Sequence, residues 1–304
     1  MARSLDVVHL GSASRDLTDD DPRGWRLGGG VTYAALTTAR LGLSTAAAIG
    51  VDELAATAWE LDLLRDAGVE VLPIPLPDGP VFHNEERDGG RVQVAHSAGV
   101  RLPDEPLPPR WQTARAWSVV PVADELPQGL ATQIPDGALV ALGWQGLLRT
   151  LTAGARVERR APRRDAVLTR ADLVGLSRDD VGRDVAVAAL TSLLRDGARL
   201  AITDGPAGGA LITVRQGRAH TRVQYAPVDV GPEVDATGAG DTFLAALLSA
   251  ILADGPTASW PTEEQVHFAA AASAIAVAGV GLGGVPTDTD AVRRAAASAV
   301  PAAD

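Results

Sequence analysis

Residues 234–243, Val-Asp-Ala-Thr-Gly-Ala-Gly-Asp-Thr-Phe, carry the most concentrated chemistry in the chain. Gly238, Ala239 and Gly240 have almost no side chain, so their backbone amides can converge at the start of the apolar helix expected next. A helix N-terminus carries partial positive charge and unpaired N–H donors, which suits an anion. Asp241 stands beside that point, where a carboxylate repels phosphate but can take a proton from a hydroxyl that attacks it. The spacing therefore predicts phosphoryl transfer.

The same residues also allow plainer interpretations. Asp241 alone could be a first-turn carboxylate that complements the helix dipole, and Asp235 could cap the turn. Gly28–Gly30 could be a loop that needs positive φ, and Asp16 could be a turn residue. A glycine run after a strand also suggests a dinucleotide site, but the G-x-G-x-x-G spacing is absent. The combination of these segments favours a substrate site.

Composition excludes several other chemistries. The 304 residues include no cysteine, so disulfides, thiol nucleophiles and thiolate metal sites are ruled out. They include no lysine either, which excludes Schiff-base catalysis and the lysine-dependent P-loop. A net charge of −11 argues against nucleic acid or an acidic membrane as the main partner. Because neither a signal peptide nor an apolar run of membrane-spanning length is found, we expect a cytoplasmic protein.

Strand and helix patterns alternate along the chain. Their alternation predicts a mainly parallel sheet covered on both faces, with ligands at the carboxyl ends of the strands. Two hairpins interrupt it, one within 80–97 with its turn at Asp88-Gly89-Gly90, the other around Gln216-Gly217. The expected strands cover 6–10, 45–49, 69–74, 116–120, 138–142, 172–176 and 199–203, and the expected helices 32–41, 52–65, 184–195, 242–252, 262–278 and 288–297.

Several segments together resemble the PfkB/ribokinase family of carbohydrate and nucleoside kinases. Residues 235–243 match its C-terminal signature almost letter for letter, and Gly28-Gly29 with 34–42 resembles its N-terminal signature. Residues 11–16 resemble its substrate-binding strand end, and 203–209 its nucleotide-binding turn. The resemblance implies one ribokinase-like domain over 1–304, a three-layer α/β/α sandwich with a mainly parallel sheet. It also implies a reduced β lid, with a hairpin near 80–97 and a shortened segment near 17–28.

The resemblance further implies ATP-dependent transfer of a phosphoryl group, with Mg²⁺, to a hydroxyl of a small molecule. Asp241 would be the general base, and Gly238, Ala239 and Gly240 the anion hole. Asp16, Gly28 and Gly29 would face the acceptor. The remaining assignments are Ser177, Thr203, Gly205, Gly208 and Gly281 for the nucleotide, Asp180 for Mg²⁺ through water, and Asp235 and Thr237 for a monovalent cation such as K⁺.

Two further acceptor contacts are expected from position alone. Asn84 lies on the first hairpin, and Gln145 or Arg149 follows a strand, so each could line the pocket. The alternative for each is a solvated surface side chain.

Three features depart from the family pattern. The usual Asn-x-x-Glu is replaced by 177–180, Ser-Arg-Asp-Asp, so Asp180 is one methylene shorter than the usual glutamate. Tyr33 and Gly30 stand where sugar kinases often carry Asn and ribokinase-like members carry Lys, which argues against ribose. Only eleven residues separate Asp16 from Gly28, so we expect most lid strands to be missing and the chain to be a monomer or a homodimer.

The acceptor class stays open between a neutral sugar, a cyclitol such as inositol, and a nucleoside. A phosphorylated sugar is disfavoured, because the predicted substrate segments contain only Arg15, Arg26 and Arg87 as cations. The alternative function is a non-catalytic ligand-binding protein on a kinase scaffold, suggested by the short lid and the altered 177–180 segment. A dehydrogenase is the third hypothesis, and NAD binding would identify it.

Overall fold

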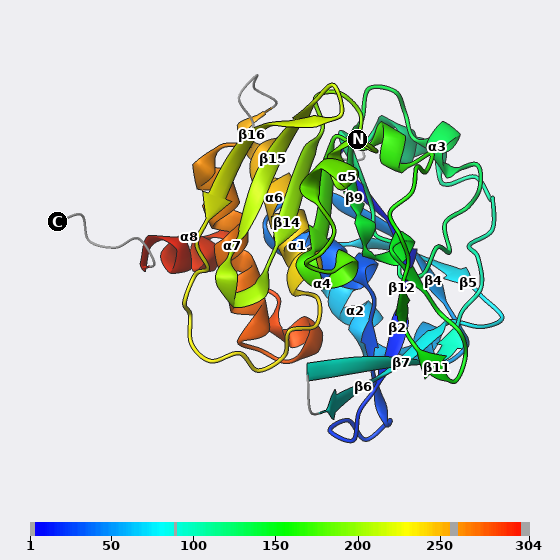
Figure 1. The fold of residues 1–304 in the computed structure, drawn as a ribbon. Helices are drawn as coiled ribbons and strands as arrows, with labels where there is room; N and C mark the ends of the chain where they lie inside the picture. The colour runs from blue at the N-terminus through cyan, green and yellow to red at the C-terminus, as the bar shows by residue number, and fades with distance from the viewer. Residues whose placement is uncertain (1–3, 88–89, 256–260, 299–304) are drawn as a thin grey trace.

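Nine strands of the described residues form the main sheet (Figure 1). The structure, a computed structural model, describes residues 4–87, 90–255 and 261–298. Parallel pairing joins the neighbouring strands β14, β13, β9, β8, β1, β4 and β5, and β15 and β16 add an antiparallel edge. In spatial order the sheet is β16 (Arg218–Tyr225), β15 (Gly209–Arg215), β14 (Arg199–Thr203), β13 (Leu173–Ser177), β9 (Leu139–Gly143), β8 (Ala116–Val119), β1 (Val7–Ser12), β4 (Thr45–Val51) and β5 (Glu70–Pro75).

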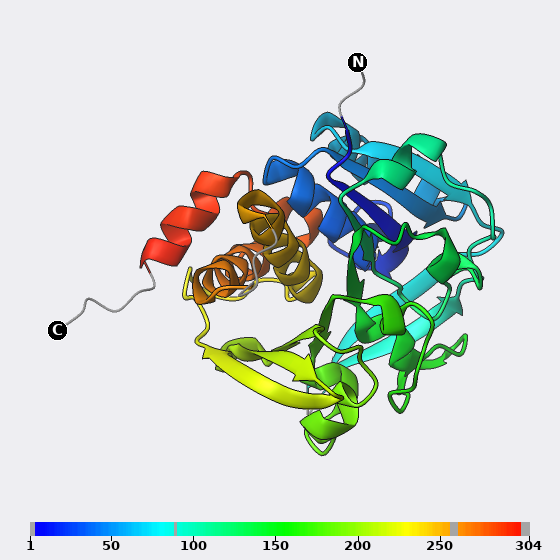
Figure 2. The same cartoon turned by 90° about the horizontal axis from the view of Figure 1, so that it is seen from above.

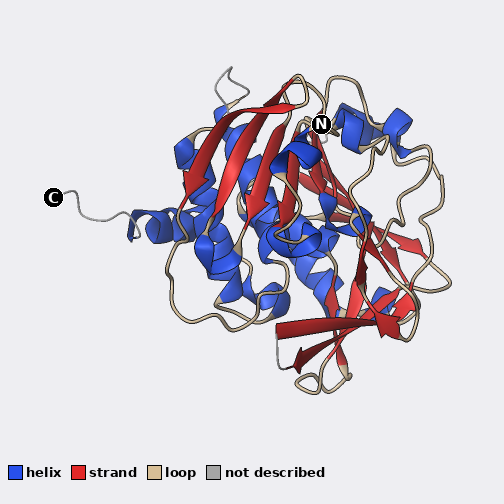
Figure 3. Cartoon of the chain, in the orientation of Figure 1, coloured by secondary structure: helices blue, strands red, loops and turns tan. Residues whose placement is uncertain are grey.

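Both faces of the main sheet are covered, as Figures 2 and 3 show. In β13, Leu173 packs into the core on one face while Val174 and Leu176 pack on the other, which is the period-two pattern of a strand buried on both sides. This confirms the expected three-layer α/β/α sandwich. The helices are α1 (Gly30–Arg40), α2 (Trp59–Asp66), α3 (Leu130–Gln133), α4 (Arg178–Val181), α5 (Val187–Thr191), α6 (Ala239–Asp254), α7 (Glu263–Val277) and α8 (Thr289–Ser298), with 3₁₀ turns at Ala55–Thr57, Pro109–Thr113, Trp144–Leu147, Leu168–Arg170, Gly205–Ala207 and Gly281–Gly284.

A second, small sheet lies beside the main one (Figures 1 and 3). Within the described residues its order is β11 (Ala155–Arg156), β7 (Gly90–Ala98), β6 (Pro80–Arg87), β2 (Ser14–Leu17) and β3 (Trp25–Gly28), and a separate pair joins β10 (Arg149–Thr150) to β12 (Glu158–Arg159). The hairpin expected within 80–97 is present as β6 and β7, although residues 88 and 89 of its turn lie outside the described residues.

The expectation that most lid strands are missing between Asp16 and Gly28 was wrong. That segment is short, but it forms two strands, and β2 pairs in parallel with β6 and antiparallel with β3. Four polar-rich residues, Ser-Arg-Asp-Leu, make β2, and such a strand shows too little alternation to be predicted from the sequence.

Two expected helices are shorter than the sequence pattern suggested. The helix expected over 184–195 is reduced to α5, which begins after Ala186, an extended residue at its N-cap. The helix expected over 52–65 begins only at α2. Asp52 does act as a cap, but it accepts the Ala55 amide at 2.8 Å and so caps the short 3₁₀ turn that precedes α2.

Candidate active site

The carboxylate of Asp16 lies on the backbone of Gly28 in the neighbouring strand. Asp16 is on β2, and a Cβ on Gly28 would overlap its Oδ2 oxygen. The Ser14 hydroxyl donates to Asp16 Oδ1 at 2.9 Å and fixes the orientation of the carboxylate. Position 28 therefore requires glycine because the acid occupies the space of any side chain there.

Asp241 lies against Gly30, which belongs to the same glycine segment and comes two residues after Gly28. It stands in the first turn of α6, and a Cβ on Gly30 would be only 2.6 Å from its Oδ1 oxygen. Two residues span at most about 7 Å of chain, so the segment 28–30 brings both carboxylates to one small area. Hydroxyl binding at one acid and proton removal at the other are compatible with this arrangement.

The turn before α6 has the backbone shape expected of an anion site. Gly238 takes the left-handed conformation with a φ of 77°, and the Tyr33 ring fills the space where its side chain would be. Because α6 begins at Ala239, the first-turn amides have no acceptor earlier in the helix. Ala239 donates instead to the Ala236 carbonyl at 3.3 Å, a long bond, and the Gly240 amide follows it in the same turn.

The surroundings of Asp241 shift its pKa. Burial, together with the negative charge of Asp180, raises the pKa to about 7, although the positive charge of Arg149 lowers it. A carboxyl with a pKa near 7 is a far better base than an ordinary aspartate at neutral pH. These charges also locate Asp180 and Arg149 within electrostatic reach of Asp241.

Asp180 caps the short helix α4. Its Oδ2 accepts the Ser177 amide at 2.7 Å, and the Ser177 hydroxyl accepts the Asp179 amide at 3.2 Å. Its Oδ1 accepts from Gln145 Nε2 at 2.9 Å, so Gln145, expected at the acceptor, contacts the residue assigned to the metal. Burial raises the pKa of Asp180 as well. A cation nearby would stabilise these two partly buried carboxylates together.

Asp235 ties the motif turn to the segment that follows α7. Its two oxygens accept the Thr237 amide at 2.9 Å and the Gly281 amide at 3.1 Å. Gly281 has a φ of 52°, which favours glycine. Asp235 thus has a clear structural role, and the cation assigned to Asp235 and Thr237 remains a prediction.

The turn from Thr203 to Gly208 follows β14 at the carboxyl end of the strand. Gly205 and Gly208 both have positive φ, 48° and 79°, and the Asp204 amide donates to the Gly208 carbonyl at 2.8 Å. Arg183 forms two hydrogen bonds with Asp204, at 2.8 and 3.0 Å. The turn is therefore well ordered and lies at the edge of the sheet where ligands bind.

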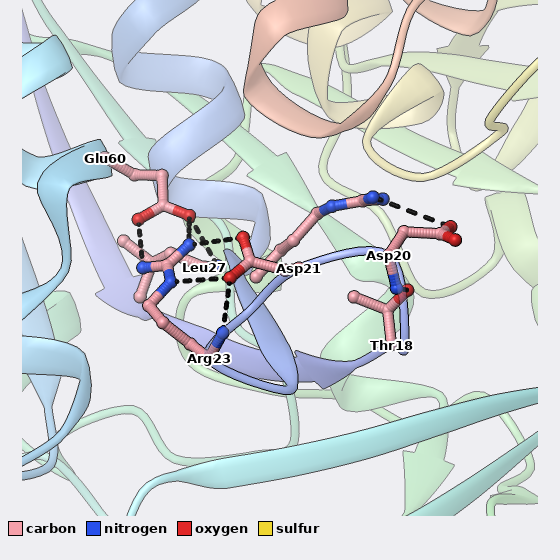
Figure 4. Close-up of polar contacts among 7 residues, drawn as sticks. Thr18, Asp20, Asp21, Arg23, Leu27 and Glu60 are labelled. Carbon is pink, nitrogen blue, oxygen red and sulfur yellow. Dashed lines mark hydrogen bonds and ion pairs between the residues drawn. The ribbon is translucent and has the colours of Figure 1, made fainter.

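The loop between β2 and β3 is fastened to the main body by a buried ion pair (Figure 4). Glu60 on α2 accepts from Arg23 at 2.6 and 2.8 Å and from the Leu27 amide at 3.1 Å. The same guanidinium also bonds Asp21 and holds the pKa of that carboxyl down at about 2. These contacts fix the strand that delivers Gly28.

Comparison with known protein families gives a match over part of the chain. Residues 167–289, which include α6 and its N-terminal turn, match the model of the pfkB family carbohydrate kinases. This segment of the chain is therefore similar to the PfkB carbohydrate kinases. The match supports a phosphotransferase that acts on hydroxyl groups. A search of the curated proteins finds no match.

Solved structures share the fold across nearly the whole chain. Ribokinase from Giardia lamblia aligns with a TM-score of 0.71 at 16% identity, over 97% of this chain and 99% of its own. Arabidopsis thaliana ribokinase, solved with ribose and ATP, aligns at 0.67 and 19%, over 97% and 99%. A variant of a pyrophosphate-dependent myo-inositol-1 kinase aligns at 0.70 and 18%, over 96% and 99%. At these identities the likeness establishes the fold alone.

The candidate site contains groups that the sequence did not single out. Gly30 was read as a substitution for lysine, whereas its missing side chain leaves room for Asp241. Glu125, a buried acid, accepts the amides of Ser12 and Val122, and no pattern in the sequence marks it. Arg149 was weighed only as an alternative to Gln145. Asn84 accepts from Gln93 at 3.1 Å, and Gln93 in turn accepts from Arg149, so this hairpin residue is linked to the site.

Two absences apply to the described residues only. Among them, no three histidine, aspartate or glutamate side chains gather as a metal-binding cluster. No helix among them has the length and apolar character needed to cross a bilayer.

Proposed function

We propose that this protein transfers the γ-phosphoryl group of ATP to a hydroxyl of a small sugar-like molecule, with Asp241 as general base. The observation that carries the proposal is the pairing of Asp16 and Asp241 against Gly28 and Gly30. Asp16 binds and orients the acceptor, because a carboxylate can accept from two hydroxyls at once. Asp241 removes the proton of the reacting hydroxyl as it attacks phosphorus.

The amides at the start of α6 receive the transferred phosphoryl group. Gly238, Ala239 and Gly240 present N–H groups and no bulky side chain, so negative charge that develops there meets fixed donors. The turn from Thr203 to Gly208 lies beyond the end of β14, where the nucleotide is expected to bind.

The residues fit Mg²⁺ in the way that phosphoryl-transfer sites usually hold it. One or two carboxylates plus phosphate oxygens and waters suffice for Mg²⁺, so a cluster of three acids is not required. Asp180 supplies a hard oxygen ligand, through water, and its burial beside Asp241 favours a nearby cation. When bound, the metal neutralises charge on the transferred phosphate. A monovalent cation at Asp235 and Thr237 is part of the proposal as an accessory ion.

A coupled assay tests the proposal directly. ATP and pyrophosphate are each offered as donor, because both occur in the names of structural neighbours. The acceptors are hexoses, pentoses, cyclitols and nucleosides, each also tested in phosphorylated or carboxylate form where one exists. ATP-dependent turnover of one acceptor supports the proposal. Tight ligand binding without turnover would instead favour a non-catalytic binding protein.

A further inference from the structure

A cavity of about 350 Å³ opens beside the candidate active site. Four segments surround it: the chain that leaves β7, the loop after β8, β10, and the residue that follows β12. Its volume is within the range of small-molecule sites. The lining residues that matter here are Arg101, Arg149, Arg160, Asp124 and Glu125.

The two acids of this cavity already have partners within the protein. The Glu125 carboxylate accepts the backbone amides of Ser12, Val122 and Ala123 at distances from 2.7 to 3.1 Å. Asp124 pairs with Arg160 at 2.9 Å and with Arg163, which lies outside the lining, at 3.0 Å. Among the described residues, neither acid forms a direct ion pair with the other two arginines.

Those two arginines have only uncharged acceptors. Arg101 donates to the Leu126 carbonyl. Arg149 donates to the Val122 carbonyl at 2.5 Å and to the Gln93 side chain at 3.1 Å. Among the described residues, no carboxylate forms an ion pair with Arg101 or Arg149 within 4.0 Å. The lining thus carries three arginines against two carboxylates, a formal excess of one positive charge, although the chain as a whole carries −11.

The cavity borders the acceptor side of the site. Arg149 is close enough to both Asp16 and Asp241 for their charges to act on its guanidinium. Glu125 is bonded to the amide of Ser12, which ends β1 just before the strand that carries Asp16. A molecule with its hydroxyl at Asp16 and Asp241 can therefore extend past Arg149 into this cavity.

We propose that the acceptor alcohol carries an anionic group, a phosphate or a carboxylate, which binds between Arg101, Arg149 and Arg160. The inference rests on the proposed function. A guanidinium presents parallel N–H donors that match the oxygens of either anion, and an anion bound there would balance the excess positive charge of the lining. Arg101 is then a specificity-determining residue that contacts the far end of the acceptor and not the reacting hydroxyl.

This acceptor class differs from the sequence-based expectation for a structural reason. A phosphorylated sugar was disfavoured because the predicted substrate segments offered only three arginines. Of these, Arg15 pairs with Asp52 at 3.0 Å and Arg26 faces Asp20 at 3.6 Å, and the side chain of Arg87 lies outside the described residues. The cluster in the cavity comes from other parts of the chain.

Matched acceptor pairs test the proposal. Each neutral sugar is compared with its terminal phosphate and its terminal carboxylate, which also separates the two anionic classes. We expect kcat/KM to be at least tenfold higher for one anionic form. Arg101→Gln should raise KM for that acceptor at least tenfold with little change in KM for ATP, and Arg101→Lys, which keeps the charge, should restore part of the loss. Arg163→Gln is the control, because Arg163 lies outside the lining of the cavity, and it should leave KM unchanged.

Equal turnover of neutral and anionic acceptors, with Arg101→Gln affecting both alike, would overturn the proposal. If no acceptor is turned over, the proposed function fails. Calorimetric titration of the same sugar phosphates and sugar carboxylates then tests separately whether the cavity binds an anion. Binding to the wild-type chain that Arg101→Gln weakens and Arg163→Gln preserves would support the anion site. Absence of binding would overturn it.

Discussion

The Asp241 carboxylate rests directly on Gly30, so that a methyl group at position 30 would stand 2.6 Å from Asp241 Oδ1. Gly30 is the first residue of α1, and Asp241 lies in the first turn of α6. The close packing of the two helix starts therefore fixes the position of the base.

Replacing Gly30 with alanine tests this packing. The backbone at position 30 does not have positive φ, so alanine fits the helix and should leave the melting temperature equal or slightly higher. The added methyl must displace the Asp241 carboxylate, and we expect kcat to fall by about 10²-fold, the size of effect that an error of about 1 Å produces. Steady-state kinetics and thermal denaturation measure the two effects.

The control is Gly137→Ala, since a Cβ at Gly137 meets nothing within 4 Å. It should leave kcat unchanged. A Gly30→Ala enzyme with the wild-type kcat would show that Asp241 need not lie where the structure has it.

The pKa of Asp241 predicts an acid limb in the pH profile. The active form of a general base is the carboxylate, so kcat/KM for the acceptor should rise with pH up to about 7 and then level off. Below that point it should fall about tenfold per pH unit. Because the positive charge of Arg149 lowers this pKa, Arg149→Gln should move the midpoint to higher pH. A midpoint near the ordinary pKa of aspartate would contradict the assignment.

Asp16 should act on acceptor binding. Removing its carboxylate in Asp16→Ala takes away the hydrogen bonds to the acceptor and leaves the donor turn at 203–208 untouched. We expect KM for the acceptor to rise at least tenfold while KM for ATP stays within about twofold, a difference of about 1.4 kcal/mol or more in acceptor binding. A rise confined to KM for ATP would place Asp16 on the donor side.

The buried pair between Glu60 and Arg23 should contribute to stability. The Glu60 side chain is 4% exposed, and its loss in Glu60→Ala leaves Arg23 without its main partner. We expect the free energy of unfolding to fall by about 3 kcal/mol, as for other broken buried pairs. Chemical denaturation measures it. Asp62→Ala on the same helix breaks only an exposed pair with Arg65 and should cost at most about 0.5 kcal/mol. If Glu60→Ala and Asp62→Ala lowered the free energy of unfolding equally, burial of the Glu60 pair would have no role in stability.

The fold followed from the sequence because local signals mark its elements. The alternation of strands and helices predicted the parallel sheet, and the small residues of 235–241 predicted the turn that opens α6. The extent of the small sheet did not follow, because β2 and β3 have four residues each and depend on pairing with each other and with β6.

The charge of the cavity could not be predicted either. Arg101, Arg149 and Arg160 come from separate segments, and only the folded chain shows that Arg101 and Arg149 are bonded to carbonyl or amide groups alone, whereas other arginines of the chain have carboxylate partners. Likewise, the sequence marks Gly30 as unusual, but the structure gives the reason. The Asp241 carboxylate of α6, more than 200 residues further along the chain, occupies the space beside Gly30.

The most direct test of the account is the single-turnover rate of Asp241→Asn with saturating ATP, Mg²⁺ and the acceptor found in the assay. Asparagine keeps the size of the side chain but cannot take the proton. We predict unchanged ATP affinity and a rate at least about 10²-fold lower than that of the wild-type chain. A near wild-type rate would contradict the assignment of Asp241 as the general base.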